Sequence, residues 1–170
     1  MEVKNVGGRW TVGGRRRAMR QRWRWTVDGT SVDARRNCRE HATMSKLAQS
    51  FQDLEVYQEA FRLQQEIFTM SKRLPAEERF SLTDQIRRSS RSIGANIAEA
   101  WAKRRYPAHF LSKLTDTDGE LQETLHWLAS VSGCSYIAET QVQKLGDQAA
   151  VVGRLLGSTI NNYQSFCSPQ

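Results

Sequence analysis

The chain has 170 residues with 25 Lys and Arg, 18 Asp and Glu and only three prolines, a composition that suits one domain and favours helix over sheet. No stretch reaches the roughly 20 apolar residues that cross a bilayer. The N-terminus lacks the apolar core of a secretory signal. The three cysteines, Cys38, Cys134 and Cys167, have no metal or redox spacing. We therefore expect a cytoplasmic protein with reduced thiols and no membrane partner.

The net charge of +7 comes from the first 43 residues. Residues 1–43 hold eleven Lys and Arg against four Asp and Glu, a difference of seven, whereas residues 44–170 hold fourteen of each. Because this first segment has few aliphatic side chains to bury, we predict a disordered basic extension. Its Arg22-Trp23-Arg24-Trp25 run has the residue types that stack on bases and contact phosphates. Alternatively, translation starts at Met44 and the extension is not made.

The first predicted helix runs from about 51 to 73, and Pro75 ends it. Helical spacing predicts that its apolar stripe consists of Leu54, Tyr57, Ala60, Phe61, Ile67 and Phe68. The second helix runs from about 81 to 104, with Ser81 as its predicted N-cap. Its core stripe is predicted at Leu82, Ile86, Ile93, Ile97 and Trp101. Gly94 and Ala95 inside it predict a close contact with a neighbouring helix.

The third predicted helix begins at Pro107 and ends near 131, and its polar centre at 115–120 is expected to weaken it locally. Its expected core positions are Phe110, Leu111, Leu114, Leu121, Leu125 and Leu128. A turn at 132–135 leads to a fourth helix from about 138 to 163. Four such helices joined by short loops predict an all-α, antiparallel up-down-up-down four-helix bundle over 44–166, with a short tail at 167–170.

The second predicted helix carries the candidate binding residues. A helical wheel places Arg87 and Arg91 one turn apart, largely away from the core. With Arg88 they form a predicted outward basic patch, and a second basic cluster beyond the helix end consists of Lys103, Arg104 and Arg105. The planar fork of arginine suits phosphate groups, which indicates nucleic-acid binding. Two alternatives stay open: the arginines are solvated, or they pair with acids of neighbouring helices such as Glu55, Glu59, Glu66, Glu120 and Glu123.

A polar row beside the core stripe is interpreted as structural. The wheel aligns Arg88, Ser92, Asn96, Glu99 and Lys103. We expect Asn96 and Glu99 to be partly buried and hydrogen-bonded to another helix, because unpaired burial is costly. The residues for which we predict a structural or interface role are Gln85, Ser92, Asn96 and Glu99.

No catalytic or metal-binding function is predicted. Glu123 and His126 give one Glu-x-x-His pair, whereas a dimetal carboxylate bundle needs two. The sequence contains no glycine-rich phosphate loop, nucleophile elbow or Cys/His cluster. Cys134 lies in a turn without a basic neighbour that would favour its thiolate. We therefore expect a protein that is not an enzyme and that uses no cofactor.

Several motifs resemble one bacterial family. They are Phe51-x-x-Leu54-x-Val56-Tyr57-Gln58-x-Ala60, Leu74-Pro75-x-x-Glu78-x-Phe80-x-Leu82-x-x-Gln85-Ile86-Arg87-Arg88-Ser89 and Ser92-Ile93-x-x-Asn96-Ile97-Ala98-Glu99, followed by Phe110-Leu111 and Glu120-Leu121. In these residues the chain is similar to the 23S rRNA-intervening-sequence (S23) proteins. The resemblance implies a four-helix bundle that assembles as a ring-like homopentamer and has a role around RNA. A related bundle protein is the accessory factor of diversity-generating retroelements, where a basic pentamer binds nucleic acid and a reverse transcriptase.

Together these observations predict a non-enzymatic homo-oligomer that binds RNA or DNA with little sequence preference. Symmetry would repeat the arginine patch once per subunit, and several weak contacts would then act together. The alternative hypothesis is a scaffold that recruits another protein and binds no nucleic acid. In that case Arg87 and Arg88 would form ion pairs between subunits.

Overall fold

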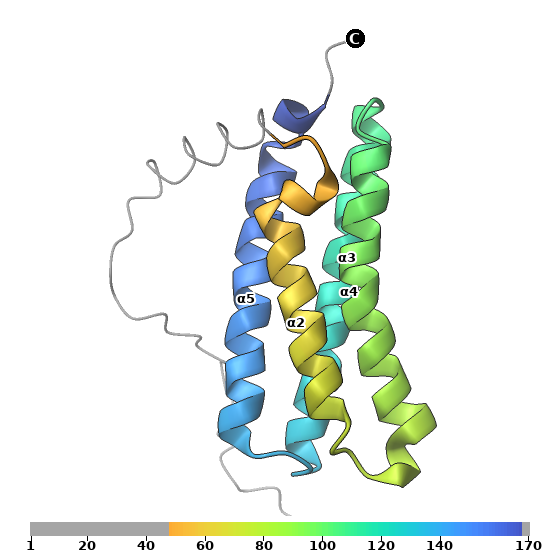
Figure 1. Ribbon diagram of the computed structural model, residues 1–170, viewed down its shortest axis with the longest axis vertical. Coiled ribbons are helices and arrows are strands. Elements are labelled where there is room, and N and C mark those ends of the chain that lie inside the picture. The colour runs from red at the N-terminus through yellow and green to blue at the C-terminus, as the bar shows by residue number, and fades with distance from the viewer. Residues whose placement is uncertain (1–47, 168–170) are drawn as a thin grey trace, which may run out of the picture.

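The computed structural model describes residues 48–167, and all regular elements in this range are helical (Figure 1). The four long helices are α2 (Glu55–Ser71), α3 (Asp84–Ala102), α4 (Pro107–Gly133) and α5 (Glu139–Asn161). Short helical turns flank them: η1 (Phe51–Asp53), η2 (Ala76–Glu78), η3 (Arg79–Thr83) and η4 (Tyr163–Phe166). The predicted extension at 1–43 and the alternative start at Met44 lie outside the described residues.

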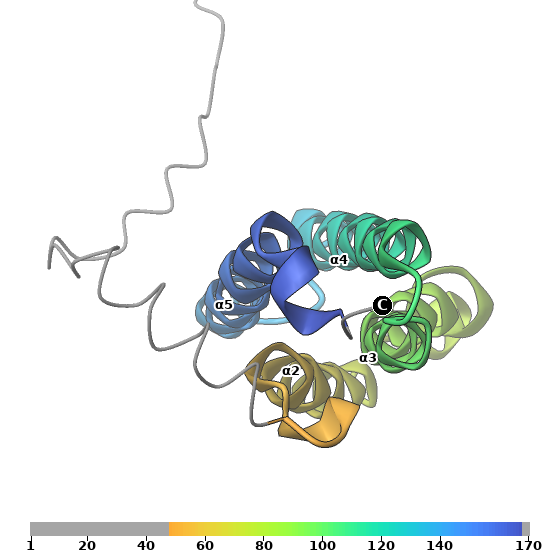
Figure 2. The same ribbon diagram turned by 90° about the horizontal axis from the view of Figure 1, so that it is seen from above.

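Contacts between helix ends show that successive helices are antiparallel. Arg87 near the start of α3 donates from Nε to Ser71 Oγ at the end of α2, over 2.7 Å. Lys113 near the start of α4 pairs with Glu99 near the end of α3. Seen along the bundle, α2 lies beside α3 and α5, and α4 completes the square (Figure 2). The predicted up-down-up-down bundle is confirmed. No helix within residues 48–167 is long and apolar enough to span a bilayer.

The predicted core is confirmed for α3 and corrected for α2. All five residues of the stripe predicted for the second helix are buried, with Leu82 in η3 and the other four in α3. In α2, however, Phe61 is 45% exposed, and the buried apolar side chains are Val56, Ala60, Leu63, Ile67 and Met70. This buried set follows the 3–4 spacing of one helix face. Tyr57 and Phe68, both half-buried, and Phe61 lie along its edge, so the prediction of Phe61 as a core residue is wrong.

One local prediction, the N-cap of the second helix, also needs correction. Ser81 does not cap α3, because the chain already turns helically from Arg79 and the boundary falls at Thr83. The Ser81 hydroxyl instead donates to the Glu78 carboxylate. The polar centre of α4 does not interrupt the helix, which is continuous over Pro107–Gly133. Its inward-facing Thr117 is buried and donates to the carbonyl of Lys113 over 2.8 Å, so no buried hydroxyl is left unpaired there.

Small side chains of α3 face two neighbours. Gly94 lies against the Tyr57 ring of α2, and a Cβ built on Gly94 would be 3.6 Å from Tyr57 Cε2. This is an ordinary contact, so the predicted close approach at Gly94 involves a side chain and leaves room for a methyl group. On the α4 side, buried Ser89 accepts a hydrogen bond from Thr124 Oγ1 over 3.0 Å. A buried polar contact therefore joins α3 and α4.

Candidate nucleic-acid interface

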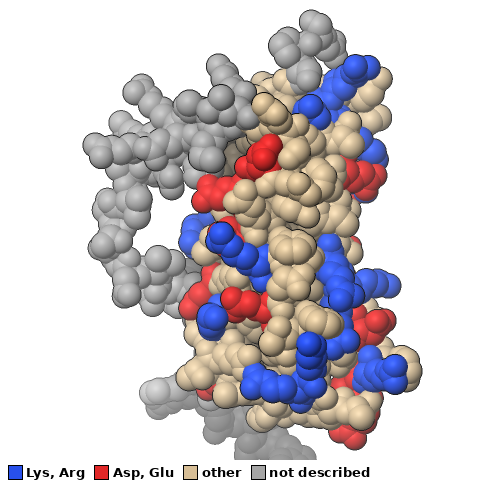
Figure 3. Space-filling view, viewed as in Figure 1, with Lys and Arg blue, Asp and Glu red and all other residues tan. Residues whose placement is uncertain are grey.

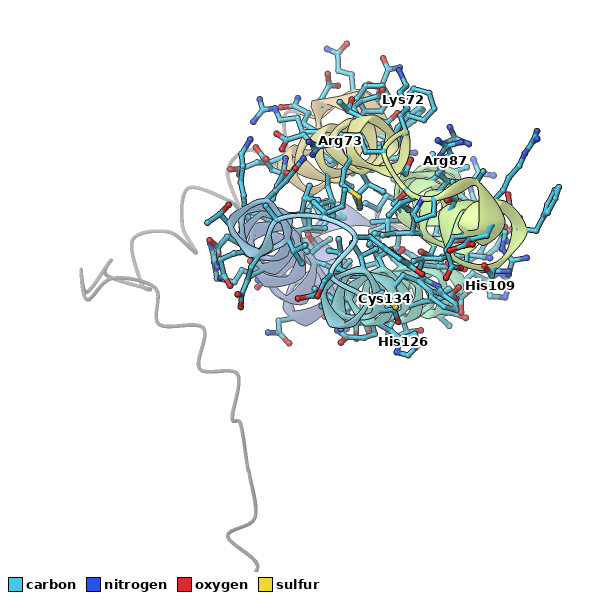
Figure 4. All side chains as sticks on the ribbon, turned by 90° about the horizontal axis from the view of Figure 1, so that it is seen from below. Lys72, Arg73, Arg87, His109, His126 and Cys134 are labelled. Carbon is cyan, nitrogen blue, oxygen red and sulfur yellow. The ribbon has the colours of Figure 1, made fainter. Side chains whose placement is uncertain are left out.

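Three cations from two helices surround one phenyl ring on the α2–α3 face. The Phe68 ring centroid lies 4.6 Å from Lys72 Nζ, 5.0 Å from Arg87 Cζ and 5.7 Å from Arg91 Cζ. We call these four residues the Phe68 cluster. Figure 4 shows Lys72 and Arg87 on the same side of the bundle, and Figure 3 shows basic side chains gathered over α2 and α3 on this face.

Antiparallel pairing creates the Phe68 cluster. Phe68 in the last turn of α2 and Lys72, the helical C-cap residue that follows it, are four residues apart and therefore share a face. The hydrogen bond from Arg87 to Ser71 fixes the start of α3 beside this turn, and Arg91 follows one turn later. The aromatic face attracts each cation. The sequence prediction placed Phe68 in the core and left out Lys72, although the i, i+4 spacing of the two residues was a signal that they share a face.

The charge of the Phe68 cluster is not neutralised within the described part of the chain. Lys72, Arg87 and Arg91 form no ion pair there, whereas Lys144 pairs with Glu66 over 3.0 Å and Arg62 pairs with Glu59. Like charges held close together repel one another. A bound anion would relieve this repulsion, which makes the cluster suited to phosphate.

Arg88 lies apart from this cluster, on the α4 side of α3. Its charge acts on Glu120 of α4, whose pKa is raised mainly by burial, further raised by Glu123 and partly lowered by Arg88. The three arginines predicted as one patch therefore divide between two sides of the helix. Arg87 and Arg91 come together, and Arg88 faces acidic side chains of α4.

The second predicted basic cluster is largely engaged within the bundle. Lys103 Nζ is 2.5 Å from Glu99 Oε1. Arg104 donates from Nη1 to the carbonyl of Trp101 over 2.8 Å, and its Cζ lies 4.2 Å from the indole centroid. Arg105 is exposed and has no side-chain partner within residues 48–167. Of this cluster, Arg105 alone is free in that range to contact a ligand.

Glu99 makes the predicted connection between helices. Its carboxylate joins Lys103 of the same helix to Lys113 of α4, whose Nζ is 2.9 Å from Glu99 Oε2. Asn96 is half-buried as expected, but it makes no side-chain hydrogen bond among the described residues. The same holds for half-buried Gln85 and Ser92. The predicted polar clasp is therefore formed by Glu99, not by Asn96.

The family follows from comparison with known proteins. The sequence model described as 23S rRNA-intervening sequence protein matches residues 52–158, which is more than half of the chain. The protein belongs to this family. A protein of unknown function from the S23 ribosomal protein family of Bacteroides thetaiotaomicron VPI-5482 has a similar crystal structure, with 32% identity and a TM-score of 0.57. The match covers 62% of this chain and 95% of that one. No curated protein matches the chain.

The residues that suggested metal chemistry have other roles in this family member. Glu123 accepts a hydrogen bond from Trp127 Nε1 over 3.0 Å, and His126 is exposed with its ring against Trp127. Within residues 48–167, no three His, Cys, Asp or Glu side chains gather as metal ligands would. Figure 4 shows His126 and Cys134 on the side of the bundle away from Lys72.

Glu99 is expected to make stability depend on pH. Hydrogen bonds from Lys103 and then from Lys113 hold its pKa below the ordinary value. Because the folded pKa is below the unfolded one, this stabilisation is present above the unfolded pKa and is lost as pH falls, below about pH 5. We expect Glu99→Gln to flatten the pH dependence of the unfolding free energy in this range, measured by denaturant titration. Glu77→Gln, at an exposed site outside this contact, should retain it.

Proposed function

We propose that this protein is a non-enzymatic, self-associating cytoplasmic bundle that binds RNA or DNA through the Phe68 cluster. The supporting observation is the convergence of Lys72, Arg87 and Arg91 on one face without an acidic partner among the described residues. Such cations contact phosphate oxygens, which supply most sequence-independent affinity. The family description refers to 23S rRNA, so RNA is the first ligand to test.

The chemistry of the cluster favours contacts with the nucleic-acid backbone. Arginine guanidinium groups already lie over the Phe68 ring, and Phe68 is half-buried, so the ring supports the cations instead of offering a free stacking face. Contacts of this kind carry little sequence information. One cluster per subunit gives weak binding, and self-association presents several clusters to one strand and increases the overall affinity.

The test is fluorescence anisotropy of a labelled single-stranded RNA with the full chain over a salt series. We expect Arg87→Ala/Arg91→Ala to weaken binding by about tenfold or more, since hydrogen bonds to charged groups are each worth about 1.5–3 kcal/mol. The slope of log affinity against log salt should become shallower by about 1.4, because about 0.7 is lost per phosphate contact in a single strand.

The matched control removes the same charge elsewhere. Arg62→Ala/Arg154→Ala also removes two arginines, here both exposed, and it keeps residues 1–43 and their charge in place. This variant should bind with nearly wild-type affinity and salt slope. Equal losses in both double variants would mean that net charge, and not the Phe68 cluster, determines binding. If wild type does not bind and Arg87→Ala/Arg91→Ala dissociates the oligomer, the protein scaffold replaces this proposal.

A further inference from the structure

An aromatic ring projects into solvent from the α2–α3 connection. Phe80 is 80% exposed, although phenylalanine is among the residue types most often buried. Its turn is fixed by buried neighbours, since Leu82 and Thr83 in the same η3 turn are both buried. The Arg79 guanidinium lies beside the Phe80 ring, with Cζ 5.4 Å from the ring centroid. An ordered turn thus presents an aromatic ring beside an exposed positive charge.

An apolar groove lies between the end of α4 and the start of α5. Its volume is about 370 Å³, and the lining includes Leu125, Leu128, Val142 and Gly146. Gly133 and Gly146 contribute no side chain to fill it. The acidic residue of the lining is Glu139, which is exposed. The groove therefore combines an apolar interior with one negative charge, which complements the pair Phe80 and Arg79.

The ring and the groove are at the same end of the bundle but on different sides of it. Tyr136 in the α4–α5 connection donates to Glu78 Oε1 in the α2–α3 connection over 2.9 Å, which fixes both connections at one end. Seen along the bundle, α3 and α5 lie on opposite sides of α4 (Figure 2). Because Phe80 is 80% exposed, its ring does not occupy the groove of its own chain.

We infer that Phe80 of one copy inserts into the α4–α5 groove of a second copy, where Arg79 pairs with Glu139. This inference rests on the self-association proposed above and names the contact that produces it. Because the Phe80 side chain and the groove are different surfaces, the contact is head-to-tail, and each pair of copies keeps one unused Phe80 and one unused groove. Such contacts continue from copy to copy, and the chains close into a cyclic oligomer when the rotation between copies allows it.

The experiment measures the mass of the full chain in solution by light scattering after size exclusion, without nucleic acid. Wild type is expected at a multiple of the 19.5 kDa chain mass. Phe80→Ser should shift the mass to that of one chain, and Ala129→Arg, at an exposed position of the groove lining, should do the same. Tyr106→Ser is the control, because Tyr106 is 57% exposed but lies in the α3–α4 connection at the other end.

A charge exchange tests the pairing directly. Arg79→Glu and Glu139→Arg should each lower the mass, and the two changes together should restore it. Circular dichroism of each variant serves as the control for folding. A wild-type chain that stays at 19.5 kDa at micromolar concentration would overturn both the contact and the self-association. An oligomer whose mass is unaffected by Phe80→Ser would overturn the contact alone. Loss of self-association would remove the gain in RNA affinity that several clusters provide together, whereas the anisotropy experiment tests separately whether the Phe68 cluster itself contacts RNA.

Discussion

Replacing Ile93 by aspartate is expected to abolish the cooperative unfolding transition of the bundle. Ile93 is fully buried in the middle of α3, so the substitution removes an apolar side chain from the core and buries a carboxylate among apolar residues. Changes of this kind cost about 4 kcal/mol or more, which approaches the whole stability of many domains. Far-UV circular dichroism during heating measures the effect.

The control for Ile93→Asp is Ala95→Asp, two residues further along the same helix. Ala95 is exposed, so its aspartate stays in water and costs about 0.7 kcal/mol or less in helix propensity. A cooperative melt for Ile93→Asp close to that of Ala95→Asp would contradict the assignment of Ile93 to the core.

Truncating Phe110 to alanine is expected to destabilise the bundle by about 3–5 kcal/mol. Phe110 is 1% exposed near the start of α4 and packs against Phe166, with ring centroids 6.1 Å apart. Truncation leaves a cavity beside Phe166 into which the surrounding structure relaxes only partly. Denaturant titration should show a lower midpoint, and the melting temperature should fall by roughly 10 °C.

Phe61→Ala is the matched comparison for Phe110→Ala, because it deletes the same ring from a surface position. Phe61 is 45% exposed and stacks on Tyr57, so its loss is expected to cost about 1 kcal/mol or less. If the two truncations lower the free energy of unfolding equally, Phe61 belongs to the core of α2, as predicted from the sequence, and the exposed position described in the structure is contradicted.

The fold was predictable from the sequence because helix periodicity and short loops leave few arrangements. The isoleucines of α3 repeat on one face, and no other face of that helix is apolar enough to compete. In α2 two candidate faces are adjacent, one rich in aromatic residues and one with Val56, Leu63 and Met70. Periodicity alone does not rank such faces. The choice depends on where α3 and α5 approach, which is a property of the assembled bundle.

The candidate site was predictable in part for the same reason. The helical wheel placed Arg87 and Arg91 together because they belong to one helix. The contribution of Lys72 and the aromatic support from Phe68 come from α2, and they depend on the register between two helices. The separation of Arg88 from Arg87 and Arg91 likewise depends on a neighbouring helix, because Arg88 interacts with Glu120 of α4. Single-helix patterns contain no information about these partners.

The order of helices around the bundle has a consequence for how the chain folds. Each helix packs against its neighbour in sequence, and the distant pairing is between α2 and α5, where Lys144 meets Glu66 and Arg73 donates to Gln141. A chain rich in such local contacts has a low contact order, and helical bundles of this kind fold in microseconds to milliseconds. The α2–α3 and α3–α4 pairs can therefore form while the chain is being synthesised, and docking of α5 against α2 closes the bundle last.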